Sequence, residues 1–310
     1  MNLLLLSTST STAFAQRLAA SLGAPLAAMD RREFPDGERY LRLPLADHLD
    51  LLGKDVVLVG ATDTDAHLNE LYRAGCAAAK GGARTLVLVI PYFGYSTMER
   101  STKAGEVVTA KTIARQLSAI PRAQRGNWTI LMDLHSAGIV HYFEGDMVAL
   151  ELYAETRIVE AIQELDLKDL CLASTDMGRA KWVETFANRL HAPVALIHKK
   201  RISGSQTRIN AVVGDVAGKN VVIFDDMIRT GGSLLQAVDA YLKAGAVSVH
   251  AVATHLVLPT GTIEKLESSQ LASITGTDTH PRHQELAGRP RWRIVSVAPI
   301  FAEVVGRLVM

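Results

Sequence analysis

The sequence predicts an α/β fold made of two tandem copies of one domain, each a mainly parallel β-sheet flanked by helices. Apolar segments long enough for buried strands alternate with amphipathic helical segments along all 310 residues, a pattern typical of parallel sheets. Three short sequence motifs also occur twice, in the same order and with similar spacing between the first and second occurrence. They are residues 24–27, 53–57 and 79–83, which return as 192–195, 218–222 and 242–246. This internal repeat predicts a first domain at 1–149 and a second at 150–310.

Continuous apolar segments predict the inner strands, because a strand buried on both faces has no polar alternation. In chain order these strands are 3–6, 56–60, 85–90, 129–134, 170–174, 194–198, 221–224 and 249–254. Apolar residues at helical spacing predict the helices. These are 13–22, 66–80, 108–119, 152–164, 179–190, 234–244 and 300–308. We expect the last helix to pack on the first domain.

Composition excludes several classes of partner. The chain has 33 basic and 32 acidic residues and a net charge of +1, which predicts no nucleic-acid or membrane surface. The apolar start lacks the basic segment of a signal peptide, and no apolar segment approaches the roughly 20 residues that span a bilayer. Cys76 and Cys171 lie far apart in apolar segments and are expected to be buried, reduced thiols. We therefore expect a cytoplasmic protein.

The strongest functional signal is the stretch 221–233. Four apolar residues form a strand that should end at two carboxylates, Asp225 and Asp226, and a small-residue turn then leads into the helix at 234–242. The free backbone N–H groups of such a turn suit a phosphate group, and the adjacent acids suit the hydroxyl groups of a ribose. Together they predict a pocket for a sugar phosphate.

The first copy has lost this pattern. At the equivalent place it has residues 60–66, Gly-Ala-Thr-Asp-Thr-Asp-Ala, without the acid pair or the double glycine. The second copy is therefore predicted to keep the sugar-phosphate pocket, and the first is predicted to serve another task.

The acid pair and the turn resemble the phosphoribosyl diphosphate (PRPP) loop of type I phosphoribosyltransferases and of ribose-phosphate diphosphokinases. A simple phosphoribosyltransferase needs one such domain, whereas two copies, one of them altered, fit the diphosphokinase family better. Other segments resemble that family in order along most of the chain. They are 34–38, 90–95, 106–111, 133–135, 174–179, 196–201 and 277–281. The resemblance implies that both domains are type I phosphoribosyltransferase-like.

The resemblance also implies roles for particular residues. The implied nucleotide-binding residues are Phe34, Asp36, Glu38, Thr97, Met98 and His135. The implied ligands of Mg²⁺ are His135 and Asp176. The implied catalytic cations are Arg100, Lys103, Lys199 and Arg201. The implied ribose 5-phosphate residues are Asp225, Asp226, Arg229, Thr230, Gly231, Gly232 and Ser233.

The implied reaction transfers a diphosphoryl group from ATP, or another nucleoside triphosphate, to ribose 5-phosphate, and it gives PRPP and AMP. Negative charge spreads over the moving group, so cations and positioning should dominate catalysis. Lys199 and Arg201 lie two residues apart at a strand end, so both side chains can point to one face of the sheet. Family nucleotide sites are completed across subunits, which implies a homo-oligomer; dimer, trimer and hexamer all fit the sequence.

Several positions depart from the family pattern. Thr97-Met98 stands where most members have Arg-Gln, Arg179 replaces a usual glycine, and Arg229 replaces a common acid. Residues 105–110 and the Gly231-Gly232 pair look like the plant-type second class, which implies a broader choice of nucleotide donor and no phosphate-dependent regulation.

Two alternatives follow from these departures. A non-catalytic protein that regulates or scaffolds an active synthetase would explain Thr97-Met98 and Ser101. A type I phosphoribosyltransferase that consumes PRPP would explain the loop at 225–233 alone, but it would not need the altered first copy.

Overall fold

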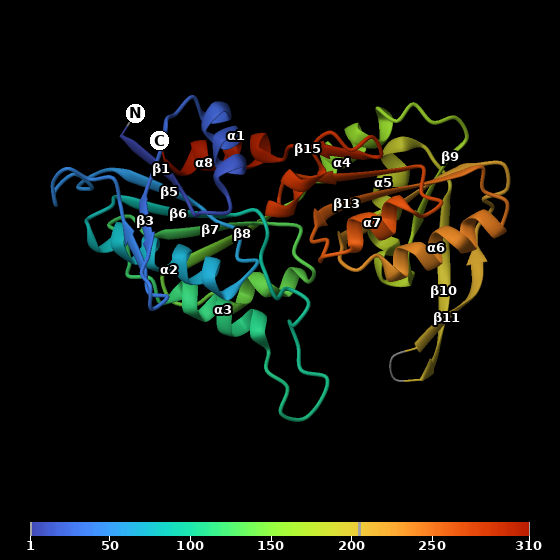
Figure 1. Ribbon diagram of the computed structural model, residues 1–310, viewed down its shortest axis with the longest axis horizontal. Coiled ribbons are helices and arrows are strands. Elements are labelled where there is room, and N and C mark those ends of the chain that lie inside the picture. The colour runs from blue at the N-terminus through green and yellow to red at the C-terminus, as the bar shows by residue number, and fades with distance from the viewer. Residues whose placement is uncertain (1, 204–205, 310) are drawn as a thin grey trace. The chain divides into compact units, whose positions relative to one another are not determined.

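The computed structural model describes residues 2–203 and 206–309; the side chains of 199–203 and 206–210 lie outside the description. The chain divides into two compact units (Figure 1). The first comprises Met1–Tyr153, Thr279–Pro281 and Ser296–Met310, and the second comprises Ala154–Asp278 and Arg282–Val295. Each contains a mainly parallel sheet with helices packed on it, so the predicted fold class is confirmed.

The first unit contains a six-stranded sheet in the order β2-β1-β5-β6-β7-β8. All neighbouring strands in it are parallel. The strands are β1 (Leu3–Ser7), β2 (Leu26–Ala27), β5 (Asp55–Val59), β6 (Thr85–Ile90), β7 (Asn127–Met132) and β8 (Met147–Leu152). Every residue of β5 and β6 is buried, as expected for central strands covered on both faces.

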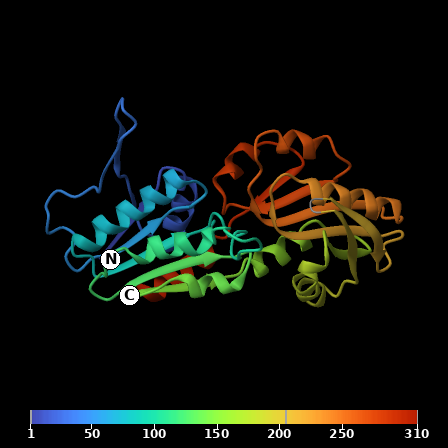
Figure 2. The same cartoon turned by 90° about the horizontal axis from the view of Figure 1, so that it is seen from below.

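Helices cover both faces of this sheet (Figures 1 and 2). They are α1 (Thr12–Leu22), α2 (Asp65–Lys80), α3 (Thr109–Ser118), α8 (Ala298–Leu308) and the 3₁₀ helix η1 (Ala137–Tyr142). The C-terminal helix α8 packs on α1, where the rings of Phe14 and Phe301 meet edge to face with centroids 5.5 Å apart. The last helix of the chain thus belongs to the first unit.

A separate antiparallel ribbon projects from the first sheet (Figure 2). It consists of β3 (Asp30–Glu33) and β4 (Arg39–Arg42). Both strands are rich in charge and largely exposed, so the apolar pattern gave no sign of them. Gly37 at the tip has a φ of +87°, a conformation that glycine adopts without strain.

The second unit contains a seven-stranded sheet in the order β11-β10-β9-β12-β13-β14-β15. Its strands are β9 (Leu170–Ser174), β10 (Val194–Ser203), β11 (Gln206–Val213), β12 (Asn220–Ile228), β13 (Ser248–Leu256), β14 (Ser273–Thr277) and β15 (Trp292–Val295). Only the edge pair β10–β11 is antiparallel. Its helical segments are α4 (Glu155–Gln163), η2 (Met177–Arg179), α5 (Ala180–Leu190), α6 (Gly232–Lys243), α7 (Thr262–Glu267) and η3 (Pro281–Leu286). Within the described part of the chain, no helix has the length and apolar character needed to cross a bilayer.

One predicted boundary is wrong in a way that matters for the site. We expected the strand at 221–224 to end before Asp225, but β12 continues to Ile228. The neighbour β13 is long enough to keep pairing with it, from Asp225–Ala253 to Ile228–Leu256. On its other side, β12 loses its partner β9 after Phe224–Ser174. Asp225 and Asp226 therefore lie inside a strand that is paired on one side only.

Candidate active site

Apart from the antiparallel edge strand β11, the second sheet has the same strand arrangement as the first. Each sheet has one point where the order of successive strands across the sheet reverses direction. In the second unit the neighbours of β9 are β10 on one side and β12 on the other; in the first unit the neighbours of β1 are β2 and β5. Ligands of open α/β sheets bind beside the carboxyl ends of the strands at such switch points. The loops after β9 and β12 are therefore the expected site of the second unit.

The acid pair lies at this point, with its two carboxylates held differently. The Thr175 hydroxyl donates to Asp225 Oδ2 at 3.0 Å, and the backbone N–H of Asp226 donates to Asp225 Oδ1 at 3.0 Å. Asp226 is buried, with 7% of its surface exposed. Two carboxylates so close in a buried place disfavour each other's ionised form.

Arg179 supplies the compensating charge. Its Nη2 lies 2.6 Å from Asp226 Oδ2, and its Nε lies 3.7 Å from Asp225 Oδ1. Burial and the neighbouring Asp226 raise the pKa of the Asp225 carboxyl to about 7, while the Thr175 hydrogen bond and the Arg179 charge oppose the rise. The sequence marked Arg179 as a departure but did not predict this ion pair. The sequence did contain a signal for it, because Arg179 lies in the loop after the strand at 170–174, which was expected to lie near the acids.

The turn at 230–233 has the backbone expected of an anion site. Gly231 has a φ of +70° and precedes the first residue of α6. A side chain there would also meet Leu266, since an added Cβ would lie 2.8 Å from Leu266 Cδ2. The Lys265 ammonium donates to the Thr230 carbonyl at 3.1 Å, which fixes the turn from α7. Arg229 and Ser233 are exposed beside it.

The loop after β9 contains the predicted metal ligand Asp176. One of its oxygens accepts the Gly178 N–H at 2.8 Å, and the Ser174 hydroxyl donates to the Asp176 carbonyl at 2.6 Å. Asp176 is only half-buried. Its carboxylate thus caps η2, and a role in holding Mg²⁺ stays a prediction.

The predicted catalytic pair Lys199 and Arg201 lies on β10. This strand pairs with β9 only at Val194 and Ala195, and beyond them it pairs with β11 alone. The side chains of Lys199 and Arg201 lie outside the described residues, so their predicted orientation stays a prediction.

In the first unit, His135 follows β7 in a sharply bent loop. Asp133 has a φ of +39°, and the Leu134 N–H donates to Glu151 Oε1 at 2.8 Å. Burial raises the pKa of the Glu151 carboxyl. His135 itself is half-buried.

The long loop between β6 and α3 holds the predicted residues Thr97, Met98, Arg100 and Lys103. Arg100, Met98 and Lys103 are exposed, and Arg100 has a weak contact with Glu99 at 3.4 Å. The Glu106 carboxylate accepts the Thr102 and Lys103 N–H groups at 2.7 and 3.1 Å. The loop thus has internal order at its tip while its cations face solvent.

The β3–β4 ribbon holds the remaining predicted nucleotide residues, Phe34, Asp36 and Glu38, at its exposed tip. The tip is closed by a backbone bond from the Phe34 N–H to the Glu38 carbonyl at 2.8 Å. The Asp36 carboxylate accepts the Glu38 N–H at 3.1 Å, so Asp36 shapes the turn. Phe34 is 46% exposed.

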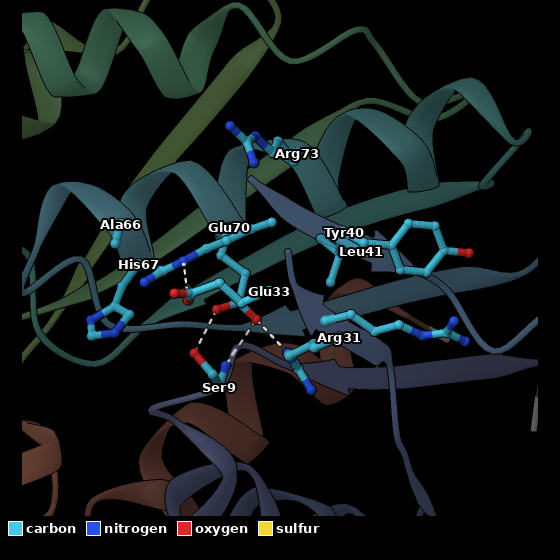
Figure 3. A pocket seen from close by; sticks show the side chains of 11 residues that line it. Ser9, Arg31, Glu33, Tyr40, Leu41, Ala66, His67, Glu70 and Arg73 are labelled. Carbon is cyan, nitrogen blue, oxygen red and sulfur yellow. Dashed lines mark hydrogen bonds and ion pairs between the residues drawn. The ribbon is translucent and has the colours of Figure 1, made fainter. Parts of the chain in front are cut away.

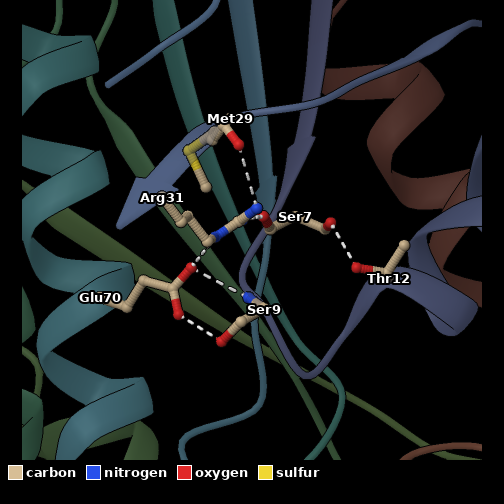
Figure 4. A network of polar contacts seen from close by, with 6 residues as sticks. All are labelled: Ser7, Ser9, Thr12, Met29, Arg31 and Glu70. Carbon is tan, nitrogen blue, oxygen red and sulfur yellow. Dashed lines mark hydrogen bonds and ion pairs between the residues drawn. The ribbon is translucent and has the colours of Figure 1, made fainter. Parts of the chain in front are cut away.

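A polar network, missed from the sequence, fixes the base of this ribbon (Figure 4). Glu70 on α2 accepts Arg31 Nε at 2.6 Å, the Ser9 N–H at 2.9 Å and the Ser9 hydroxyl at 2.6 Å. Arg31 also donates to the Ser7 carbonyl. Glu70 is 39 residues from Arg31, and no local pattern links them.

A hollow of about 310 Å³ lies between α2 and the ribbon (Figure 3). Its lining residues are Ser9, Arg31, Arg32, Glu33, Arg39, Tyr40, Leu41, Ala66, His67, Glu70 and Arg73. The Asp63 carboxylate, at 2.8 Å from His67 Nδ1, raises the pKa of His67. Most of the lining residues are charged or polar, and four of them are arginines, but they include none of the predicted nucleotide residues.

Among the residues that the structure describes, no group of three or more His, Cys, Asp or Glu side chains could hold a metal ion. Mg²⁺ in phosphoryl-transfer sites is often held by one or two carboxylates, with substrate phosphates and water completing six ligands. Single acids such as Asp176 fit that mode, in which the nucleotide brings most of the ligands.

Two family models match the chain. The N-terminal domain of ribose phosphate pyrophosphokinase matches residues 3–120, and the phosphoribosyl synthetase-associated domain matches residues 202–310. The first match lies within the unit that contains the β3–β4 ribbon. The second includes β12 and the turn before α6, and it continues into Ser296–Met310, which belongs to the first unit.

Full-length relatives agree with these matches. The ribose-phosphate pyrophosphokinase of Synechococcus elongatus is 34% identical over 98% of this chain and 90% of its own length. That of Helicobacter hepaticus is 32% identical over 97% and 94%. The crystal structure of phosphoribosylpyrophosphate synthetase from Mycobacterium smegmatis superposes with a TM-score of 0.86 at 27% identity, covering 99% of both chains. The chain belongs to the ribose-phosphate pyrophosphokinase family.

Proposed function

We propose that this protein is an active ribose-phosphate pyrophosphokinase that transfers a diphosphoryl group from a nucleoside triphosphate to ribose 5-phosphate. The observation that carries the proposal is the ribose 5-phosphate constellation of the second unit. Asp225 and Asp226 lie at the switch point of a mainly parallel sheet, five residues before a glycine turn that opens α6. A carboxylate pair beside free backbone N–H groups suits hydroxyls and a phosphate on one small sugar.

In the proposed reaction the 1-hydroxyl of ribose 5-phosphate attacks the β-phosphorus of the triphosphate. The new O–P bond forms as the bond between the β-phosphorus and the oxygen bridging to the α-phosphorus breaks. That oxygen leaves with the nucleoside monophosphate, and the hydroxyl proton is released. The Gly231–Ser233 turn would bind the 5-phosphate, and the acid pair would orient the ribose by accepting hydrogen bonds from its hydroxyl groups.

Cations would stabilise the charge that spreads over the transferred group. We assign this role to Lys199 and Arg201 on β10 and to Arg100 and Lys103 on the exposed loop before α3. Mg²⁺ bound to the nucleotide would neutralise phosphate charge, with His135 and Asp176 as its protein ligands. Phe34, Asp36 and Glu38 of the β3–β4 ribbon would bind the nucleotide, together with Thr97, Met98 and His135.

The proposal extends to domains, assembly and location. The repeat supports binding of the nucleotide by the first domain, predicted at 1–149, and of ribose 5-phosphate by the second, predicted at 150–310. Residues Ser296–Met310 of that second range belong to the first structural unit. The exposed ring of Phe34 at the ribbon tip supports homo-oligomer formation, in which the ribbon serves a second copy. Of the two cysteines predicted to be buried, Cys171 is buried and Cys76 is half-buried. They form no disulfide, which supports a reducing compartment, the cytoplasm.

We expect the protein to accept nucleoside triphosphates other than ATP as donors. Thr97 and Met98 offer neither a cation nor a carboxamide, and Met98 is 43% exposed, which supports a permissive base site like that of the plant-type class. The same residues support the alternative of a non-catalytic regulatory partner. The retained acid pair and its turn argue against a mere scaffold.

Phosphorus NMR of the products tests this function. Pure protein is mixed with ribose 5-phosphate and Mg²⁺, and ATP, GTP, CTP and UTP are added in parallel samples. We expect PRPP with a nucleoside monophosphate, and the pattern across samples gives the donor choice. A nucleoside diphosphate would contradict attack at the β-phosphorus, and no turnover with any donor would favour the regulatory partner.

A further inference from the structure

The position of Arg179 in the second unit raises a question about charge. Asp225 and Asp226 are adjacent on β12, and their side chains are 23% and 9% exposed. Such a pair needs a cation nearby to stay ionised. Arg179, itself only 14% exposed, contacts both acids, at 2.6 Å through Nη2 and at 3.7 Å through Nε.

The backbone that presents Arg179 is firmly held. Arg179 is the last residue of η2 and directly precedes α5. The next turns of α5 pack on β12 through an aromatic cluster: Phe186 meets Phe224 edge to face at 4.5 Å, and Trp182 lies 6.3 Å from the same ring. Phe224 directly precedes Asp225. The helix that follows Arg179 is therefore packed on the strand that contains the two acids, and this packing fixes the distance between Arg179 and the acids.

A guanidinium and a divalent cation would compete for this place. A metal bound by both acids would use carboxylate oxygens at about 2 Å, and Asp226 Oδ2 and Asp225 Oδ1 already face Arg179. Hydroxyl groups are different, because an ionised carboxylate has about four lone-pair sites and can accept hydrogen bonds beside its contact with Arg179. A ribose hydroxyl can therefore bind while Arg179 stays, whereas a divalent cation would be repelled by the guanidinium charge 2.6 Å from Asp226 Oδ2.

We propose that Arg179 is a built-in cation of the ribose subsite, which holds the Asp225–Asp226 pair ready for the ribose hydroxyls and keeps a divalent cation out of that subsite. Arg179 is a positioning residue in this view, since it acts through the acids. The choice of ribose 5-phosphate as the ligand rests on the proposed function; the competition between Arg179 and a metal does not.

Binding of Mn²⁺ tests the competition directly. The wild type, R179M, R179K and R179M/D226N are titrated with Mn²⁺ without nucleotide or sugar, and free Mn²⁺ is measured by electron paramagnetic resonance. We expect R179M to bind an additional Mn²⁺ relative to the wild type, and we expect this binding to disappear in R179M/D226N and to be absent in R179K. Equal Mn²⁺ binding by the wild type and R179M would overturn the proposal.

Kinetics give a second readout that a purely structural role would not change. The KM for ribose 5-phosphate is measured at saturating Mg-nucleotide while free Mg²⁺ is varied. We expect the wild-type KM to stay constant, and the R179M KM to fall about tenfold as Mg²⁺ takes the place of the lost guanidinium. R179K keeps a cation beside the acids, so its KM should depend on free Mg²⁺ as little as the wild-type KM does. A wild-type KM that falls steeply with free Mg²⁺ would overturn the proposal without any variant, so the test survives if R179M does not fold.

The outcomes separate the two proposals. If the protein forms no PRPP with any nucleotide but R179M gains the Mn²⁺ site, the proposed function fails and the role of Arg179 stands. If PRPP forms but R179M gains no Mn²⁺ site, the proposed function stands and the role of Arg179 fails.

Discussion

The two switch points of the molecule have equivalent backbone positions, but the second has a pair of acids and the first has none. The last strand pair before each is Ser7–Val59 in the first unit and Ser174–Phe224 in the second. One residue later, Thr8 and Thr175 match, and so do Gly60 and Asp225. The Thr175 hydroxyl donates to Asp225 at 3.0 Å. The Thr8 hydroxyl is buried, and it has no hydrogen-bond partner in the part of the chain that the structure describes.

Space was lost along with charge in the first copy. A Cβ added at Gly60 would lie 2.7 Å from Thr8 Cγ2 and 2.9 Å from Leu71 Cδ1. The helix α2 thus fills the volume that a carboxylate would need. The comparison teaches that the two copies of a duplicated domain can keep the same strand order while only one keeps the binding site. In the first copy the acids are absent, and side chains fill the volume that they would need.

The largest effect should come from the second switch point. We expect D226N to lower kcat/KM for ribose 5-phosphate by about 10³-fold, because a neutral carboxamide replaces the carboxylate that accepts from the ribose and pairs with Arg179. The melting temperature should fall as well, since Arg179 loses its charged partner at 2.6 Å. Steady-state kinetics and thermal melts measure both. The matched control is D239N, an exposed aspartate on α6, which should behave as the wild type; normal activity of D226N would remove the ribose site from this acid.

The converse substitution should fail to create a site in the first unit. We expect G60D to destabilise the protein by about 1–3 kcal/mol through overpacking against Thr8 and Leu71, with no gain in sugar binding. Urea unfolding measures the loss. G306A on α8, where an added Cβ meets nothing within 4 Å, is the control. An unchanged midpoint for G60D would show that the first switch point has room for an acid.

The sequence predicted what depends on local pattern. The inner strands followed from apolar segments, and the acid pair and turn at 225–233 followed from composition and spacing. Three features did not, because each depends on distant partners. The length of β12 is set by β13, the contact of Arg179 depends on the path of the chain after β9, and the anchor of the ribbon joins Arg31 to Glu70. The exposed, charged strands β3 and β4 lack the alternation that marks a half-buried strand.

The task of the first unit can be probed at its ribbon. We expect E70Q to raise the KM for the nucleotide about tenfold and to leave the KM for ribose 5-phosphate unchanged, because a neutral acceptor holds Arg31 less well and loosens the ribbon that presents Phe34 and Glu38. E303Q on α8, which removes an exposed ion pair with Arg307, is the control. A change in the KM for ribose 5-phosphate instead would contradict a role of the ribbon in nucleotide binding.

The acid pair should make activity depend on pH. Burial raises the pKa of Asp225 to about 7, so this carboxyl is protonated below that pH in the folded protein. An ionised carboxylate is the better acceptor for a ribose hydroxyl, and kcat/KM for ribose 5-phosphate should therefore rise about tenfold per pH unit as pH approaches 7 and then level off. D225N should abolish this limb of the profile.

Stability should change in the opposite direction. The folded-state pKa of Asp225 lies above the value of about 4 for an unfolded aspartate, so between these two values the folded state binds more protons than the unfolded state. The contribution of this group to stability is therefore greatest at low pH and is lost as pH rises through about 7. Urea midpoints of the wild type and D225N across this range measure the difference.

The smallest effects should come from substitutions of Thr8 and Thr175, which occupy equivalent positions at the two switch points. T175V removes a hydroxyl that donates to Asp225 and should raise the KM for ribose 5-phosphate severalfold, a cost of about 1 kcal/mol. T8V removes a buried hydroxyl without a partner among the described residues, so it should leave kinetics unchanged and raise stability by a few tenths of a kcal/mol up to about 1 kcal/mol. Kinetics and urea midpoints of both variants give four numbers. A kinetic defect in T8V as large as that in T175V would mean that the first switch point still takes part in binding, and the difference between the copies would then lie in the ligand and not in its loss.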